Sequence, residues 1–297
     1  MWWMETRMKI LIIGKTGQLG NALLNDILAL GHDVLAPSKE ELNIIDEDSF
    51  MDAMIHCKPE VVINTAAFHN VPLCEIEPVK AFQSNCIAVK RMAEISNEFD
   101  AWFVSFSTDY VFSGEKRRPY IESDMPSPLQ MYGLSKLAGE YGALSYNKSI
   151  IIRTCGLYGT QGAASKGGNF VDNRIKDSKQ NARIEISNDQ TVSPTYAGDL
   201  SKAVLQLIAH PSKESGIYHL VNEGYCTWYE FTKEIFEFLN IDAELVPVDR
   251  KGKTGKMRRP LFSALENEKA KRLGVTLPNW KESLHEYLKI KYTDEML

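Results

Sequence analysis

The first half of the chain alternates between two spacings of apolar residues. Compact, mainly apolar runs at residues 8–13, 61–63 and 102–106 have the length of buried strands. Between them, residues 18–30 and about 79–99 place apolar side chains at helical spacing. Strands that alternate with helices in this way favour a parallel, doubly wound sheet.

The same patterns predict the remaining elements. Gly31 fits the position just after the first helix, and Asp46 or Asp48 can cap a helix that carries Phe50 and Met54. Further strands are expected at 33–36 and 149–152, and further helices at 132–146, 170–179, 196–209, 228–239 and 280–290.

The second half is less regular and contains two stretches that are typical of loops. Residues 159–168 are rich in Gly, Ser and Lys. The basic segment 250–259 carries Arg250, Lys251, Lys253, Lys256, Arg258 and Arg259. A run of charges is usually a solvated loop, and a functional role is the alternative. No repeat or low-complexity linker separates the two halves, so we expect them to pack as one unit.

Composition and charge exclude several classes of protein. The chain has 297 residues, 44% of them hydrophobic, which is enough to bury a sizeable core. It carries 34 basic and 39 acidic side chains, a formal charge of −5, so no nucleic-acid partner is expected. No apolar stretch approaches the ~20 residues that span a bilayer, so no membrane association is expected.

Cysteine usage argues against a disulfide framework. Five cysteines occur at positions 57, 74, 86, 155 and 226, an odd number without a Cys-x-x-Cys pair. We therefore expect neither disulfides nor a metal site. Buried free thiols are typical of the reducing cytoplasm, which we predict as the location of the protein.

A glycine-rich turn follows the first predicted strand and opens the first helix in a Gly-x-x-Gly-x-x-Gly pattern. Glycine allows the tight turn and lets the backbone approach a pyrophosphate, and the helix N-terminus offers free N–H groups. This position in the chain predicts a dinucleotide cofactor. The predicted contacts are Gly14, Thr16, Gly17, Gln18, Leu19 and Gly20. A tight turn without a ligand is the structural alternative.

The end of the second predicted strand bears on the choice of cofactor. A carboxylate there would bind the adenosine ribose, but the sequence reads Pro37-Ser38-Lys39-Glu40, with no carboxylate where the strand ends. A hydroxyl and an ammonium can accept a 2′-phosphate, so this turn favours NADPH over NADH. A solvated Lys39 is the alternative, and NADH stays open.

Tyr132 and Lys136 are spaced by one helical turn and therefore lie on one helix face. An ammonium close to a phenol favours the phenolate, so we expect Lys136 to lower the pKa of Tyr132. Ser107 and Thr108 follow directly after the strand at 102–106. Ligands bind at the carboxyl ends of strands in parallel sheets. A hydroxyl at that point can orient a carbonyl oxygen beside the tyrosine.

With these motifs in place, the sequence resembles the extended short-chain dehydrogenase/reductases, and among them the dTDP-4-dehydrorhamnose reductase family. The matching segments follow the family order over nearly the whole chain. They are residues 14–20, 64–67, 75–85, 107–114, 132–136, 139–140, 153–154, 168–170, 189–190, 193–195, 216–220, 259–260 with 263, and 277–278 with 280. Their order and spacing together are specific, although each segment alone is modest.

The resemblance implies roles for individual residues. Thr108, Tyr132 and Lys136 would be the catalytic triad. Ala66 and Ala67 would pass under the nicotinamide ribose and pyrophosphate. The remaining cofactor contacts implied are Ser38, Lys39, Asp46 and Asn85, where Asn85 would also support the active-site helix. The substrate contacts implied are Phe68, Asp109, Tyr110, Lys166, Asn169 and Arg259. For the outer residues a purely structural role is the alternative.

One segment departs from the family pattern. Family members commonly have an aromatic segment such as Ser-Trp-x-Tyr-Gly after Arg153-Thr154, whereas this chain reads Cys155-Gly156-Leu157. An aromatic wall of the sugar pocket is therefore expected to be missing, which leaves the sugar open. Cys155 is expected to be a packed thiol, because no histidine stands beside it in sequence to activate it.

The resemblance implies an NADPH-dependent reductase of a nucleotide-activated 4-keto-6-deoxysugar, which would convert dTDP-4-dehydro-L-rhamnose into dTDP-L-rhamnose. A nucleotide-sugar dehydratase or epimerase is one alternative, although Tyr110 stands where dehydratases of the superfamily usually carry a glutamate. A non-catalytic NADP-binding regulatory subunit, like that of methionine adenosyltransferase, is another. A generic redox sensor is a third. The expected partner is the nucleotide-sugar, and a homodimer is compatible with the sequence.

These expectations divide the chain into an α/β protein with two parts. Residues 1–7 form a leader, and residues 8–153, with returning segments near 196–222, form a Rossmann-type doubly wound parallel sheet that binds the dinucleotide. Residues 154–195 and 223–297 form a smaller α+β substrate-binding lobe.

Overall fold

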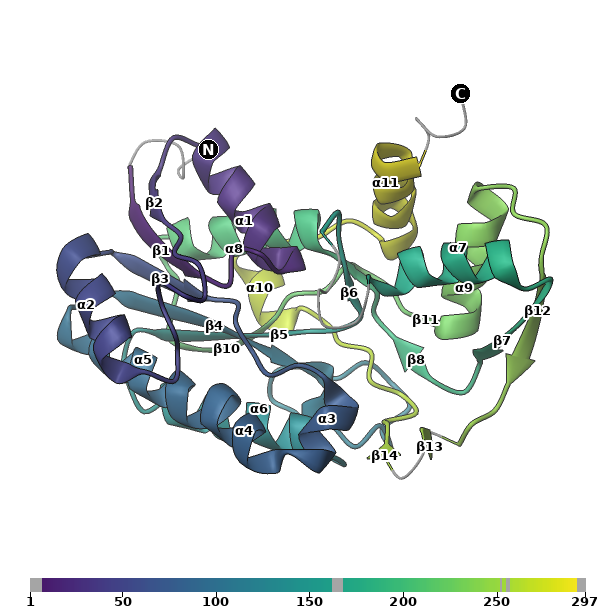
Figure 1. Ribbon diagram of the computed structural model, residues 1–297, viewed down its shortest axis with the longest axis horizontal. Helices are drawn as coiled ribbons and strands as arrows, with labels where there is room; N and C mark the ends of the chain where they lie inside the picture. The colour runs from purple at the N-terminus through teal and green to yellow at the C-terminus, as the bar shows by residue number, and fades with distance from the viewer. Residues whose placement is uncertain (1–6, 162–167, 252, 255–256, 293–297) are drawn as a thin grey trace.

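The computed structural model describes residues 7–161, 168–251, 253–254 and 257–292. Its centre is a six-stranded sheet in the order β10-β5-β4-β3-β1-β2, in which all neighbouring strands are parallel. The strands are β1 (Lys9–Ile13), β2 (Asp33–Leu35), β3 (Val61–Asn64), β4 (Trp102–Thr108), β5 (Ser149–Thr154) and β10 (Gly216–His219). The parallel, doubly wound sheet predicted from the sequence is confirmed (Figure 1).

Helices cover both faces of the sheet because successive side chains of a strand point to opposite faces. Ile10 and Ile12 of β1 join one core cluster, and Leu11 and Ile13 join another. The first cluster is covered by α1 (Gln18–Ala29), α8 (Ala197–Ala209) and α10 (Glu268–Arg272). The second is covered by α2 (Glu47–Cys57), α5 (Ala88–Glu98) and α6 (Met131–Ala143).

The helix expected over residues 79–99 is interrupted. It consists of α4 (Pro78–Phe82), a π-helical turn η1 (Gln83–Ile87) and α5. Apolar periodicity cannot reveal one turn of i→i+5 hydrogen bonds, and such turns are frequent at functional sites. The short helix α3 (Val71–Ile76) and the 3-10 turn η2 (Asp109–Val111) were not expected, since neither is long enough to show a period.

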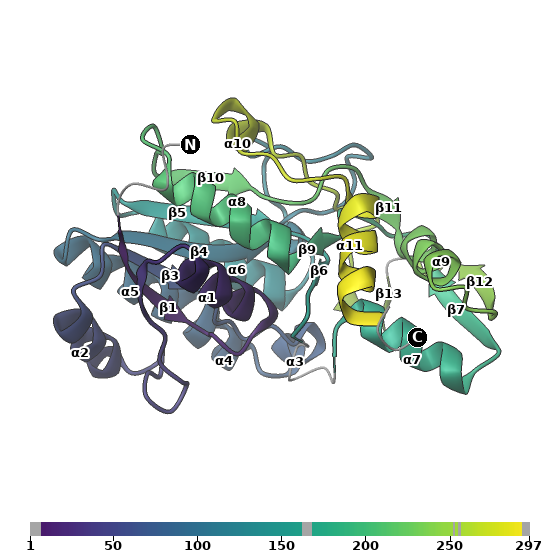
Figure 2. The ribbon, with the colours of Figure 1, turned by 90° about the horizontal axis from the view of Figure 1, so that it is seen from above.

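Other segments of the second half of the chain form a smaller mixed lobe. Its helices are α7 (Phe170–Gln180), α9 (Trp228–Phe238) and α11 (Trp280–Tyr292). Its strand pairs are β7 (Arg183–Ser187) with β12 (Glu244–Val248), β8 (Thr191–Val192) with β11 (Cys226–Thr227), and β6 (Leu157–Tyr158) with β9 (Thr195–Tyr196). Buried aromatic side chains, among them Tyr158, Phe231 and Tyr287, fill its core. Seen from above, α11 lies between the large sheet and α7 (Figure 2).

The basic segment 250–259 is not simply an open loop. Strand β13 (Lys253–Thr254) pairs with β14 (Met257–Arg258) in antiparallel register, and the side chain of Met257 is buried. Backbone pairing and one apolar anchor therefore organise this stretch, which charge patterning alone did not reveal. Within the described part of the chain, no helix is long and apolar enough to cross a bilayer.

The topology of the sheet places the site. From β1 the chain moves to β2 on one side and then returns to β3 on the other side of β1. In open parallel sheets a ligand crevice forms where the strand order reverses, outside the carboxyl ends of the strands. Gly14, Asn64 and Thr108 stand at the carboxyl ends of β1, β3 and β4, and so border this crevice.

Candidate active site

In the glycine turn after β1, backbone atoms approach so closely that side chains would not fit. Gly14 has a φ of +88°, a region that glycine occupies easily. A Cβ placed on Gly20 would lie 2.1 Å from the carbonyl oxygen of Gly14, so α1 can approach the turn this closely only without a side chain there. Gly17 precedes α1 and provides no side-chain cap. The first N–H groups of the helix are therefore left for a ligand, and the turn fits a dinucleotide pyrophosphate.

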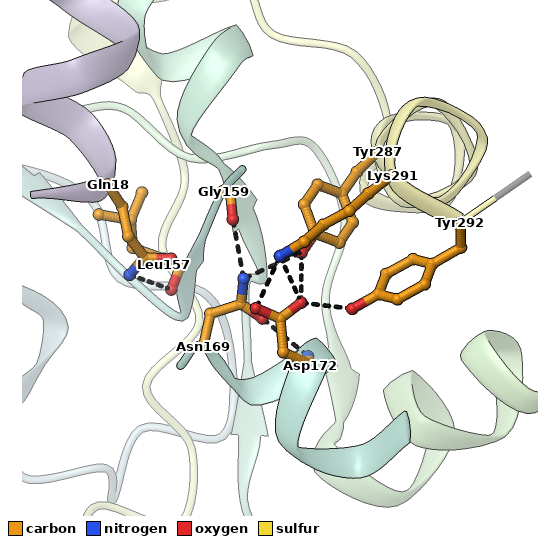
Figure 3. Close-up of polar contacts among 8 residues, drawn as sticks. All are labelled: Gln18, Leu157, Gly159, Asn169, Asp172, Tyr287, Lys291 and Tyr292. Carbon is orange, nitrogen blue, oxygen red and sulfur yellow. Dashed lines mark hydrogen bonds and ion pairs between the residues drawn. The ribbon is translucent and has the colours of Figure 1, made fainter. Parts of the chain in front are cut away.

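The other residues of this turn that were predicted to contact the cofactor differ in their exposure to solvent. Thr16 is exposed, whereas Leu19 packs in the core, so only the backbone of Leu19 could meet a ligand. Gln18 donates a hydrogen bond of 3.4 Å from Nε2 to the carbonyl of Leu157 (Figure 3). The glycine turn is thereby connected to β6 of the lobe.

The turn after β2 differs from the expectation that no carboxylate lies there. The Glu41 carboxylate accepts the backbone N–H of Ser38 at 2.7 Å, and Ser38 Oγ accepts the backbone N–H of Glu41 at 3.3 Å. The hydrogen bond from the Ser38 backbone is the largest cause that lowers the pKa of the Glu41 carboxyl, and the Ser38 side chain adds to it. The reciprocal pattern is that of a capping box, which holds an acidic group beside Ser38. Lys39 is exposed.

Three more predicted cofactor residues have contacts within the protein. Asp46 caps α2, where its side chain accepts the backbone N–H of Asp48 at 3.2 Å. The backbone N–H of Ala66 donates to the side chain of Asn64 at 3.1 Å, and Ala67 follows it at the end of β3. Ala66 and Ala67 are partly exposed.

Asn85 lies in the π-helical turn and joins two segments of the site. Its side chain accepts the backbone N–H of Phe68 at 2.8 Å and donates to the carbonyl of Phe68 at 2.9 Å. It also donates to Ser135 Oγ on α6 at 3.0 Å, and Ser135 donates to the carbonyl of Tyr132 at 2.8 Å. One amide therefore fixes the segment after β3 against the helix that carries Tyr132.

Thr108, Tyr132 and Lys136 are placed by β4 and α6. Thr108 ends β4, and its Oγ1 accepts the backbone N–H of Tyr110 at 3.2 Å. Tyr132 and Lys136 lie one turn apart on α6, with Lys136 buried. Helix α6 can approach the backbone of Tyr110 closely because Gly133 has no side chain. A Cβ on Gly133 would lie 2.2 Å from the carbonyl oxygen of Tyr110.

The pKa of Tyr132 is raised, contrary to the expectation that Lys136 would lower it. Burial is the largest cause, and the nearby Asp109, Cys74 and Tyr110 add to it, against a lowering hydrogen bond from Thr108. Burial also lowers the pKa of Lys136 to about 8, although Glu140 opposes this shift. Desolvation therefore outweighs the effect of the helical spacing in this structure.

Asp109, Tyr110 and Arg259 continue the site away from Tyr132. The rings of Tyr110 and Tyr132 lie 6.3 Å apart, edge to face. The guanidinium of Arg259 faces the Tyr110 hydroxyl and opposes the rise in its pKa that burial causes. The carboxyl of Asp109, predicted to contact substrate, is instead buried with 4% of the residue exposed and faces Ser263 and Cys155.

Asn169, also predicted to contact substrate, is buried and bonded within the lobe. It caps α7 by accepting the backbone N–H of Asp172 at 2.9 Å. Its Nδ2 donates to the carbonyl of Gly159 at 2.8 Å and to the hydroxyl of Tyr287 at 2.9 Å (Figure 3). These contacts occupy the amide, so the geometry gives Asn169 a structural role. Lys166 lies outside the described residues.

Two buried groups were missed from the sequence. Arg153 of β5 donates two hydrogen bonds, of 3.0 and 2.6 Å, to the carboxylate of Glu140 on α6, and both side chains are 1% exposed. Arg153 also lies over the ring of Phe112. Both residues had been noted only as family matches, and nothing in their local patterns shows that they pair. Among the described residues, no cluster of His, Cys, Asp or Glu has the arrangement of a metal site.

Helix α1 begins without a side-chain cap after the glycine turn, and α6 carries Tyr132 and Lys136 beside the end of β4. This combination is that of the NAD(P)-dependent enzymes of the extended short-chain dehydrogenase/reductase superfamily. The family model described as RmlD substrate binding domain matches residues 8–293. The chain therefore belongs to the RmlD, or dTDP-4-dehydrorhamnose reductase, family and is an NAD(P)-dependent reductase of that family.

Several relatives match this chain over almost their whole length. The spore coat polysaccharide biosynthesis protein SpsK of Bacillus subtilis is 37% identical, over 94% of this chain and 96% of its own. The dTDP-4-dehydrorhamnose reductase of Escherichia coli is 31% identical, over 96% of this chain and 99% of its own. The crystal structure of dTDP-4-dehydrorhamnose reductase from Bacillus anthracis in complex with NADP is 32% identical. It superposes with a TM-score of 0.89, over 95% of this chain and 99% of that one.

Proposed function

We propose that this protein uses NADPH to reduce the 4-keto group of a nucleotide-activated 6-deoxysugar, converting dTDP-4-dehydro-L-rhamnose into dTDP-L-rhamnose. The observation that carries the reaction class is that Thr108 stands at the carboxyl end of β4 and that Tyr132 and Lys136 lie one turn apart on α6, which packs against β4. The relatives named dTDP-4-dehydrorhamnose reductase support the substrate. The segment at Cys155 and the similarity to SpsK are the reasons to test other sugars as well.

In this mechanism the protein positions the keto group and moves one proton. Bound NADPH would supply a hydride to the carbonyl carbon. Tyr132 would donate its phenolic proton to the oxygen that becomes the alcohol, and its raised pKa keeps that proton in place at neutral pH. Thr108 would donate a hydrogen bond to the same oxygen. Lys136, with a pKa of about 8, stays mostly protonated at neutral pH and would bind a ribose hydroxyl.

We propose NADPH as the preferred cofactor, with NADH as the alternative. Exposed Lys39 offers an ammonium to a 2′-phosphate, whereas Glu41 in the same turn offers repulsion. The solved complex of the relative from Bacillus anthracis contains NADP, which supports the first effect as the larger one. Fluorescence titration with both reduced cofactors tests this, and a strong preference for NADH would contradict it.

On the substrate side, we propose that Arg259 binds the diphosphate and that Tyr110 and Phe68 border the sugar. Arg259 Nε is buried without a hydrogen-bond partner, and the guanidinium lies beside the hydroxyl of Tyr110. A guanidinium can hold a diphosphate through two parallel hydrogen bonds. Lys166 stays a predicted contact of the same ligand.

The experiment that tests the function measures NADPH oxidation against a panel of nucleotide-activated 4-keto-sugars, with product analysis of each reaction. Tyr132→Phe keeps the ring but removes the proton donor, so turnover should fall on the order of 10²-fold or more with little change in NADPH affinity. Near-normal turnover in that variant would contradict the assigned mechanism. NADPH binding without turnover of any sugar would favour the regulatory subunit, and a product with inverted stereochemistry but no net oxidation would favour the epimerase.

Location and assembly stay proposals. The five cysteines are free thiols, as expected for a protein of the reducing cytoplasm, which we propose as its location. A homodimer is the assembly to test first, and sedimentation of the purified protein decides between monomer and dimer.

A further inference from the structure

Asp109 is a buried carboxyl group that lacks a cationic partner. No ion pair to it exists among the described residues, and the groups that face it are the hydroxyls of Thr108 and Ser263 and the thiol of Cys155. Its Oδ2 atom is fully buried and makes no hydrogen bond of good geometry. An unpaired charge in such surroundings costs far more than the neutral acid, so the group is expected to hold its proton.

Glu140 shows the opposite arrangement in the same core. Its carboxylate is as deeply buried as Asp109, but Arg153 holds both of its oxygens at 2.6 and 3.0 Å. The fold therefore places a cation directly against this buried carboxylate. The absence of such a partner at Asp109 within the described residues is a local property of this position and not a general feature of the core.

The Thr108 hydroxyl has a limited number of hydrogen bonds to make, so the protonation state of Asp109 decides where the Thr108 proton points. A hydroxyl has one proton and two lone pairs, and Thr108 Oγ1 already accepts the backbone N–H of Tyr110. Its contact with Asp109 Oδ1 is 3.0 Å, and a further hydrogen bond joins it to Tyr132. If Asp109 were ionised, Thr108 would have to direct its only proton to that carboxylate and away from the substrate oxygen.

We propose that Asp109 is a neutral carboxylic acid that donates its proton to Thr108 Oγ1, so that the Thr108 hydroxyl proton points toward Tyr132 and the keto oxygen. Asp109 is thus a positioning residue that acts through Thr108, and it gives up no proton during reduction. The inference rests on the proposed function for the identity of the keto oxygen. Burial raises the pKa of Asp109, although the nearby side chains of Ser263, Cys155 and Thr108 oppose the rise, and this direction is the one that the role needs.

The neighbours of Asp109 define what else could titrate with it. Tyr132 on α6, Tyr110 on η2 and the Cys155 thiol after β5 face it, and burial raises the pKa of all three. The Arg259 guanidinium lies beyond Tyr110 and touches its hydroxyl. Tyr132, Tyr110 and Cys155 are neutral at neutral pH, and the Arg259 guanidinium is bonded to the Tyr110 hydroxyl and not to Asp109. None of these four groups therefore pairs a positive charge with Asp109.

Infrared difference spectroscopy tests the protonation state without substrate. The carbonyl band of a protonated carboxylic acid should be present in the protein at pH 7 and absent from Asp109→Asn. Asp172→Asn is the matched control, because Asp172 accepts the ammonium of Lys291 and its pKa is lowered, so that variant should keep the band. An unchanged band in Asp109→Asn would overturn the proposal, whether or not the protein reduces any of the sugars tested.

Kinetics test the positioning role. Asn at position 109 can still donate to Thr108 but cannot ionise, whereas Leu has a similar size and no donor. Asp109→Asn should keep turnover within about threefold, and Asp109→Leu should lose about tenfold or more, with the KM of the sugar little changed in both. Equal losses in the two variants, or a rise in KM alone, would contradict the role. If Asp109→Leu does not fold, the infrared result and the Asn variant still decide.

Discussion

The two sides of the crevice are held in different ways. The side with the glycine turn rests on six parallel strands, and its shape comes from backbone contacts such as that between Gly14 and Gly20. In its described residues the lobe has two-stranded sheets and no larger one, and contacts between side chains far apart in sequence stabilise it. The carboxylate of Asp172 on α7 accepts hydrogen bonds from three side chains of α11 (Figure 3). Substitutions should therefore act through main-chain geometry on one side and through single polar contacts on the other.

The buried pair of Glu140 and Arg153 should give the largest effect, because it lies in the core beneath the site. Glu140→Ala leaves the Arg153 guanidinium buried without its partner, which typically costs about 3–5 kcal/mol of unfolding free energy. Urea denaturation measures it. Glu268→Ala removes an exposed partner of Arg272 and should change stability by less than about 1 kcal/mol. If both variants lost a comparable unfolding free energy, the buried pair would stabilise the fold no more than the exposed one.

Arg259 tests whether the lobe side binds its ligand through a single cation. Arg259→Ala should weaken binding of dTDP by about 1.5–3 kcal/mol, the scale of a charged hydrogen bond, and leave NADPH binding nearly unchanged. Calorimetric titration measures both affinities. The matched control is Arg258→Ala, because Arg258 is the exposed neighbour in β14. If the control lost as much dTDP affinity as Arg259→Ala, a diffuse basic surface would replace the specific contact.

Gly20 tests whether backbone contacts shape the glycine turn after β1. In Gly20→Ala the new Cβ would meet the Gly14 carbonyl oxygen at 2.1 Å, so the turn must shift, at a cost of about 1–3 kcal/mol of stability. NADPH affinity should fall with it, while dTDP affinity should change little. Asn25→Ala, on the exposed face of the same helix, is the control for helix content. Full NADPH affinity in Gly20→Ala would show that the turn tolerates a side chain.

Asp172 should give the smallest effect, restricted to the lobe. Asp172→Asn removes the charge that Lys291 and two tyrosines bind, and about 1–2 kcal/mol of stability should be lost at pH 7. The folded pKa of Asp172 is lowered, so its contribution is present above the unfolded pKa and disappears as pH falls below the folded value. The difference from the unmodified protein should therefore shrink at acidic pH. Asp177→Asn, elsewhere on α7, is the control, and a pH-independent difference would contradict the assignment.

Local patterns predicted much of the fold and part of the candidate site. Apolar patterns predict five of the six strands of the main sheet, whereas the segment of β10 stands out only as a family match. The glycine turn and the spacing of Tyr132 and Lys136 could be read directly, since each depends on residues within one or two turns of chain. The capping box of Ser38 and Glu41 was also local, and its Ser-x-x-Glu pattern could have been found.

The sequence by itself thus determined the layered α/β architecture and the chemical groups at the ends of β1, β3 and β4. Only the tertiary structure decided which of those groups are removed from water and what they then contact. The pKa of Tyr132 rises because burial removes the phenol from water and because Asp109, Cys74 and Tyr110, which come from other segments, lie close to it. Asp109 and Asn169 are buried for the same kind of reason, and Glu140 meets Arg153 from another element. Desolvation and hydrogen bonds between distant segments depend on packing, which no local pattern contains.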